Sequence, residues 1–217
     1  LPFAACVYHG RYRDPDSLAR WGKSKAKAGG GGMMDLGIHR LDLLRYLIEE
    51  EVVDIKAAMR TVNKRRFLDE SRAMEVENDT DEYGCAMLQL SGGAVGILES
   101  SRISDSALGN EVFEVFGRKG SLCLSLDGGG GLRMTIPGAG TRILKAGSPG
   151  FYEAALLPFL PGARQSMGPF MDAHAAAVAN LAAMVGGEPG FPGTPDLAEG
   201  REAQKLVDRC LDAATWS

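Results

Sequence analysis

A carboxylate and an imidazole lie four residues apart just after a run of four glycines that begins at Gly29. The pattern predicts a helix that starts near Met33. Such a helix carries a polar stripe at positions i, i+4, i+7 and i+11, made of Asp35, His39, Asp42 and Tyr46. The residues on either side are mostly apolar, so we expect the helix to be largely buried. The stripe must then find polar partners inside the protein or line a cavity.

The Asp35–His39 pair has a structural and a chemical interpretation. Asp35 could cap the helix by accepting amide hydrogen bonds from its first turn, and His39 could be a core histidine. Alternatively, oxidation of an alcohol requires a base that takes the hydroxyl proton as hydride leaves the carbon, and an imidazole can be that base. Asp35 would then orient the ring or raise its proton affinity. Spacing alone leaves both interpretations open.

The surrounding pattern resembles a known family. It resembles the signature of the Gfo/Idh/MocA family of NAD(P)-dependent oxidoreductases, in which three motifs follow one another: Gly-Gly-Gly, Asp-x-x-x-His-x-x-Asp and Leu-Leu-Arg-Tyr-Leu. The segment 111–122 is similar to the strand, turn and strand that close the family's sheet, and 170–213 resembles its C-terminal helical ending. The family's glycine-rich nucleotide fingerprint and its Glu-Lys-Pro motif are not found in this chain.

The resemblance therefore implies a single substrate-binding and oligomerisation domain over residues 1–217, without the N-terminal Rossmann domain. It implies a sugar, polyol or related hydroxy compound as substrate, His39 and Asp35 as catalytic residues, and NAD or NADP bound mainly by the missing domain. The isolated chain is expected to be inactive. Because it begins Leu1-Pro2-Phe3, we infer an excised or proteolysed domain, with natural processing as the alternative.

Two other functions are compatible with the same residues. One is an NAD-dependent glycosidase of the same family, and the other is a non-catalytic module for oligomerisation or binding. Arg13 and Arg102 are candidate substrate ligands, because guanidinium donors suit hydroxyl-rich or anionic ligands. Trp21 could stack on a sugar or anchor a loop. A homo-oligomer formed through the open sheet face is a further expectation from the resemblance.

Composition excludes several other classes. A net charge of -4 and an isoelectric point near 5.5 give no general attraction to nucleic acid or to anionic membrane surfaces. No run of 18 apolar residues is present. The four cysteines are far apart and form no Cys-x-x-Cys pair, which favours reduced core thiols and a cytoplasmic protein. Nothing in the spacing of the three histidines indicates a metal site.

Hydrophobic periodicity and turn residues predict the order of the elements. Strands are expected at 4–13, 52–63, 82–90, 94–103, 111–116, 121–126 and 132–136. Helices are expected at 33–50, at 169–185 and after Thr194, with Thr194 as the cap. Residues 64–80 should be an exposed excursion whose basic trio, 64–66, is solvated. Short connections between strands predict antiparallel neighbours. The fold class is α+β, an open and largely antiparallel sheet with helices on one face, of the glyceraldehyde-3-phosphate dehydrogenase-like C-terminal domain type.

Overall fold

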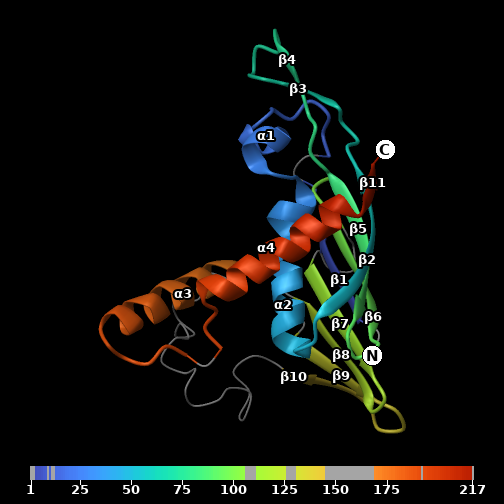
Figure 1. The fold of residues 1–217 in the computed structure, drawn as a ribbon, viewed down its shortest axis with the longest axis vertical. Helices are drawn as coiled ribbons and strands as arrows, with labels where there is room; N and C mark the ends of the chain where they lie inside the picture. The colour runs from blue at the N-terminus through green and yellow to red at the C-terminus, as the bar shows by residue number, and fades with distance from the viewer. Residues whose placement is uncertain are drawn as a thin grey trace.

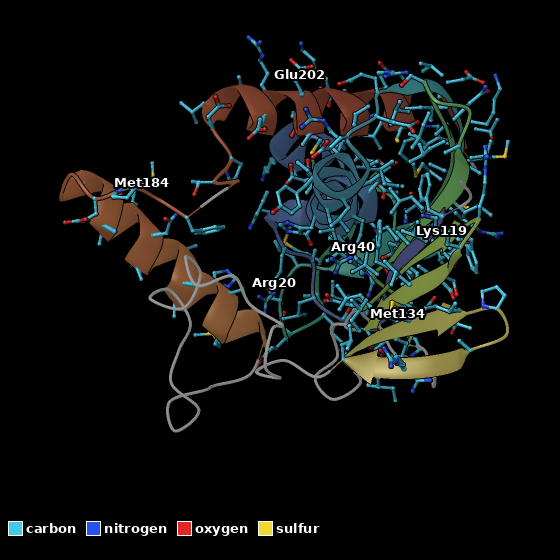
Figure 2. All side chains as sticks on the ribbon, turned by 90° about the horizontal axis from the view of Figure 1, so that it is seen from below. Arg20, Arg40, Lys119, Met134, Met184 and Glu202 are labelled. Carbon is cyan, nitrogen blue, oxygen red and sulfur yellow. The ribbon has the colours of Figure 1, made fainter. Side chains whose placement is uncertain are left out.

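The molecule is a large open sheet with helices on one face (Figure 1). The computed structural model describes residues 3–8, 10, 13–105, 111–125, 131–144, 169–191 and 193–216. The predicted strand end at 9–13 falls partly outside these residues. Helix α2 lies on the sheet and α4 crosses it, whereas α3 extends away from the body (Figures 1 and 2). The expected α+β class is confirmed.

Within the described ranges the sheet has nine strands, and most neighbours are antiparallel. In spatial order they are β10 (Gly140–Leu144), β9 (Leu132–Ile136), β8 (Gly120–Ser125), β7 (Glu111–Gly117), β1 (Phe3–Tyr8), β6 (Val95–Ser101), β5 (Tyr83–Leu90), β2 (Val52–Arg60) and β11 (Ala214–Trp216). The pairs β1–β6 and β2–β11 are parallel. The prediction of consecutive antiparallel neighbours is wrong for β6 and β7, because β1 lies between them and pairs with both. Strands β10 and β11 were not predicted.

Helix α4 (Leu197–Asp212) shows most clearly how the helical layer is built. Its buried residues recur with helical spacing and face the sheet and α2: Ala203, Leu206, Val207, Cys210 and Leu211. The N-cap is Asp196, which accepts a hydrogen bond from the Glu199 amide in a capping box. The prediction that Thr194 caps this helix is therefore wrong. Thr194 instead donates to the carbonyl of Phe191 in the preceding turn.

Helix α3 (Pro169–Val185) agrees with the predicted range, but most of its described side chains are exposed. Asn180 is the buried exception, and its amide group hydrogen-bonds the Phe191 backbone and Thr194. The short helices η2 (Trp21–Lys23) and α1 (Lys25–Ala28) were not predicted.

The predicted exposed excursion contains a hairpin of β3 (Arg65–Phe67) and β4 (Glu75–Glu77). Arg66 belongs to the basic trio that was predicted to be solvated, yet its side chain is buried and paired with Glu82. That prediction is wrong for Arg66 because a buried carboxylate, distant in sequence, offers a partner that local charge patterning does not reveal.

The face of the sheet opposite the helices is open (Figure 1). Met87, Val95 and Ile97 project from β5 and β6 on this face and are exposed. All four cysteines are free thiols. Cys210 alone is fully buried, and burial raises its pKa to about 12. In the described part of the chain, no helix is long and apolar enough to cross a membrane.

Candidate functional site

A buried carboxylate organises the glycine-rich turn that precedes the site. Asp81 accepts hydrogen bonds from the Gly31 amide at 2.7 Å and from the Met33 amide at 2.6 Å, and its own carbonyl accepts from the Gly32 amide. A Cβ on Gly31 would lie 1.9 Å from the Asp81 carbonyl oxygen, so only glycine allows this approach. The amides that could bind a nucleotide phosphate at this turn are thus used by an internal carboxylate.

The turn leads into a π-helical segment, η3 (Met33–Gly37), that continues as α2 (Ile38–Ile48). Asp35 lies in η3 and its side chain is 59% exposed. It accepts a hydrogen bond from Arg102 at 2.8 Å, and among the described residues no hydrogen bond joins it to His39. A π turn is wider than an α turn, so Asp35 is out of phase with the stripe on α2. Asp35 consequently faces Arg102, and it does not cap the helix.

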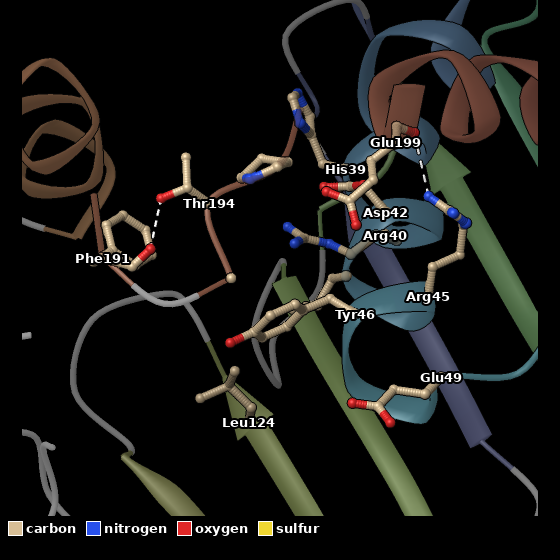
Figure 3. Close-up of a pocket in the computed structure, with 13 residues that line it drawn as sticks. His39, Arg40, Asp42, Arg45, Tyr46, Glu49, Leu124, Phe191, Thr194 and Glu199 are labelled. Carbon is tan, nitrogen blue, oxygen red and sulfur yellow. Dashed lines mark hydrogen bonds between the residues drawn. The ribbon is translucent and has the colours of Figure 1, made fainter. Parts of the chain in front are cut away.

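The rest of the predicted stripe lines a cleft of about 690 Å³. His39, Asp42 and Tyr46 lie along it on α2, and the opposite wall includes Phe191, Gly193, Thr194 and Pro195 (Figure 3). The cleft is within the size range of small-molecule sites. The expectation that the stripe lines a cavity is thus met for these three side chains. Helix α2 is less buried than predicted, since Tyr46 and Leu47 are largely exposed.

Charged groups of both signs surround the cleft. Arg40 is buried between α2 and the sheet, where it forms an ion pair with Glu111 of β7 (Figure 2). Its guanidinium and the Tyr46 ring reach from α2 toward the Thr194 segment (Figure 3). Arg45 donates to the Glu199 carbonyl at 3.2 Å. Alternating donors and acceptors beside aromatic surface suit a ligand that is rich in hydroxyl groups.

A buried ionic network adjoins Arg102, whose backbone amide donates to the Glu82 carbonyl. The Glu82 carboxylate accepts hydrogen bonds from Lys23 at 3.1 Å and from Arg66 at 2.7 Å, and also from the Asn63 amide and Asn78. Burial acts to raise the pKa of Glu82, but these hydrogen bonds and the Lys23 charge outweigh it and hold the pKa below its usual value. Burial lowers the pKa of Lys23 to about 8, although Glu82 opposes this shift.

The other predicted ligands lie apart from the cleft lining. Arg13 forms an ion pair with Asp105, which also accepts a hydrogen bond from the Gly10 amide. Trp21 is 71% exposed, so it is not a hydrophobic anchor. Within the described ranges, no group of three His, Cys, Asp or Glu side chains could hold a metal.

Sequence reasoning missed Arg40, Asp81 and the Lys23–Glu82–Arg66 network. Arg40 sits between the predicted His39 and Leu41, and only its burial against β7 distinguishes it from a surface arginine. Asp81 and Glu82 stand directly before strand β5, and paired acidic residues at a strand start were the one available signal. Lys23, Gly31 and Arg66, which donate to these carboxylates, are 16 to 59 residues away along the chain.

Comparisons with known proteins identify the family. The GFO/IDH/MocA C-terminal domain model matches residues 2–123. A levoglucosan dehydrogenase of Pseudarthrobacter phenanthrenivorans is 27% identical over 125 residues, which cover 52% of this chain and 32% of that protein.

Solved structures extend the similarity of fold to nearly the whole chain. An NAD binding oxidoreductase from Klebsiella pneumoniae superposes with a TM-score of 0.80 at 22% identity, covering 98% of this chain and 56% of that one. An inositol dehydrogenase homolog from Azotobacter vinelandii, solved with NAD+, has a TM-score of 0.72 at 21% identity and coverages of 98% and 55%. This chain spans about half the length of these structural relatives. By the match over more than half of its residues, the chain belongs to the GFO/IDH/MocA C-terminal domain family.

Proposed function

We propose that this chain is the substrate-binding half of an NAD(P)-dependent dehydrogenase that acts on a sugar, a polyol or a related hydroxy compound. The observation that carries the proposal is the cleft that begins at His39 and continues along Asp42 and Tyr46. The relatives support it, since their solved complexes include NADH with levoglucosan and NADH with myo-inositol.

The cofactor would be held mainly by a nucleotide-binding half. The glycine-rich turn of this chain does not fit nucleotide phosphates, because the Gly31 and Met33 amides already donate hydrogen bonds to the Asp81 carboxylate. A bound nicotinamide would supply the hydride acceptor. The isolated chain should therefore neither bind NADH tightly nor oxidise a substrate.

In this proposal His39 takes the proton of the reacting hydroxyl group. Its side chain is exposed at the end of the cleft, so a substrate hydroxyl can reach it. Asp35 lies one turn earlier, where its exposed carboxylate is paired with Arg102, and in this proposal it is the second catalytic residue. Arg40, Asp42 and Tyr46 offer hydrogen-bonding groups to the remaining hydroxyls.

The test is His39→Ala in the enzyme that joins this chain to its nucleotide-binding half. Loss of a general base should lower kcat by about 10² to 10⁴-fold. Thermal stability should be retained because His39 is exposed. His174→Ala, on the exposed helix α3, is the matched control and should keep kcat within about 2-fold.

Product analysis separates the alternatives. Oxidised free polyols support a dehydrogenase, and cleavage of glycosides supports an NAD-dependent glycosidase. Normal turnover of polyols by His39→Ala would remove His39 from the mechanism. Absence of turnover in the wild type with either substrate class would favour a non-catalytic module.

We also propose that the open face of the sheet forms a homo-oligomer. Met87, Val95, Ile97 and Phe116 are exposed apolar side chains on this helix-free face. Clustered apolar residues on a sheet face favour association with another molecule. Light scattering should give a dimer or a larger assembly, and Ile97→Lys should shift it to monomer. A monomeric wild type would refute this proposal.

A further inference from the structure

Arg102 touches Asp35 directly from the end of β6. Its side chain is only 9% exposed, and its Nη2 donates to Asp35 Oδ2 at 2.8 Å. Its Nη1 donates to the carbonyl of Gly22 at 3.3 Å. One planar guanidinium therefore joins Asp35 to the η2 segment, a geometry that a flexible lysine ammonium reproduces poorly.

The residues that hold Arg102 are buried and hydrogen-bonded to one another. The Arg102 amide donates to the Glu82 carbonyl at 2.8 Å. Glu82 anchors Lys23 and Arg66 through its carboxylate, and Lys23 directly follows Gly22. The Gly22 contact of the Arg102 guanidinium and the Arg102 backbone amide thus both connect to the same buried network.

The Asp35 side chain is held by fewer contacts than that of Arg102 in the described part of the chain. Its side chain is mostly exposed, and Arg102 is the hydrogen-bond partner of its carboxylate among the described residues. An exposed aspartate samples several rotamers, so a single fixed donor decides where its carboxylate points. With Oδ2 bound to Arg102, Oδ1 is directed away from this contact.

We propose that Arg102 is a positioning residue that acts through Asp35, and not a ligand of the substrate. The inference rests on the proposed function in so far as Asp35 supports turnover. It assigns Arg102 a role different from the substrate contact expected from the sequence. A substrate ligand would change KM, whereas a residue that places Asp35 changes mainly kcat.

Arg102→Met and Arg102→Lys, made in the two-domain enzyme, test the assignment. Arg102→Met should fold, because the Gly22 carbonyl keeps its hydrogen bond from Thr80 at 3.1 Å. We expect kcat to fall about 10- to 100-fold with KM changed less than about 3-fold, since small misplacements of a catalytic group have effects of this size. Arg102→Lys should recover part of kcat. Arg65→Met is the control, because its ion pair with Glu75 on the exposed hairpin is far from the site.

A double-mutant cycle identifies the route of action. In an Asp35→Asn background, Arg102→Met should lower kcat by less than about 3-fold further, because residues that act as a unit are non-additive. A full additional loss, or an effect confined to KM, would overturn the proposal and make Arg102 a direct ligand.

Crystal structures of the chain itself give a readout that does not require activity. In Arg102→Met the Asp35 carboxylate should occupy more than one rotamer, and in the wild type and Arg102→Lys one. A single unchanged rotamer in Arg102→Met would refute the positioning role even if the enzyme were active. If Arg102→Met altered the Asp35 rotamers but the wild-type enzyme had no dehydrogenase activity, the proposed function would be refuted. The conclusion that Arg102 positions Asp35 would still hold.

Discussion

Glu82→Gln tests whether the buried ionic network stabilises the domain. The substitution keeps the size of the side chain and removes its charge. Lys23 and Arg66, both at most 2% exposed, then lose the carboxylate that binds them. The added amide also presents N–H groups to neighbours that already donate, including Asn78.

The expected loss of unfolding free energy depends on which of the two cations can lose its proton. Breaking a buried ion pair costs about 3 to 5 kcal/mol, because the remaining charge stays buried without compensation. Arg66 cannot lose its proton. Lys23 can lose its proton, since its pKa is already about 8 and the Glu82 charge, which raises this pKa, is removed by the substitution. The loss of stability should therefore be larger at pH 6 than at pH 8.5, with Arg66 responsible for the part that remains.

Urea unfolding followed by circular dichroism measures the effect at both pH values. At this chain length, about 3 to 5 kcal/mol corresponds to a fall in Tm of about 6 to 20 °C. Glu75→Gln removes an exposed partner of Arg65 and should change stability by less than about 0.5 kcal/mol. A cost for Glu82→Gln below about 1 kcal/mol, or one that is equal at pH 6 and pH 8.5, would refute the reasoning.

Three further substitutions, with Gly200→Ala as a control, test the turn and the network. Gly31→Ala should lower the free energy of unfolding in urea by about 3 kcal/mol or more, because the added Cβ meets the Asp81 carbonyl oxygen. The control Gly200→Ala, in open space on α4, should stabilise the protein by about 0.5 to 1 kcal/mol. Asp81→Ala leaves the buried Gly31 and Met33 amides without acceptors and should cost about 2 to 4 kcal/mol. A change below about 1 kcal/mol in the same assay would contradict the role of Asp81 in organising the turn. The pKa of Lys23 in the folded protein, about 8, lies below its usual 10.5, so the unfolded state binds more protons between these values and stability should rise with pH there. Unfolding of the wild type and of Lys23→Met between pH 7.5 and 10 should show this rise only in the wild type, and equal slopes would exclude it.

The family and most of the elements could be predicted from local patterns. The glycine run, the Asp35–His39 spacing and the alternation in β5 are short-range features that reflect backbone and side-chain geometry. The range of α3 and the position of α2 follow for the same reason. The π turn at Asp35 could not be predicted from the local pattern, and it lies where Gly31 closely approaches the Asp81 backbone, 50 residues away.

Sequence by itself determined the order of most strands and of the long helices, the family and the chemical character of the helix that carries His39. Only the tertiary structure placed β1 between β6 and β7, buried Arg66 against Glu82, and joined Arg102 to Asp35 across 67 residues. The physical reason is that periodicity reports which face of an element is apolar, whereas a buried charge is decided by the partner that folding brings within hydrogen-bond distance.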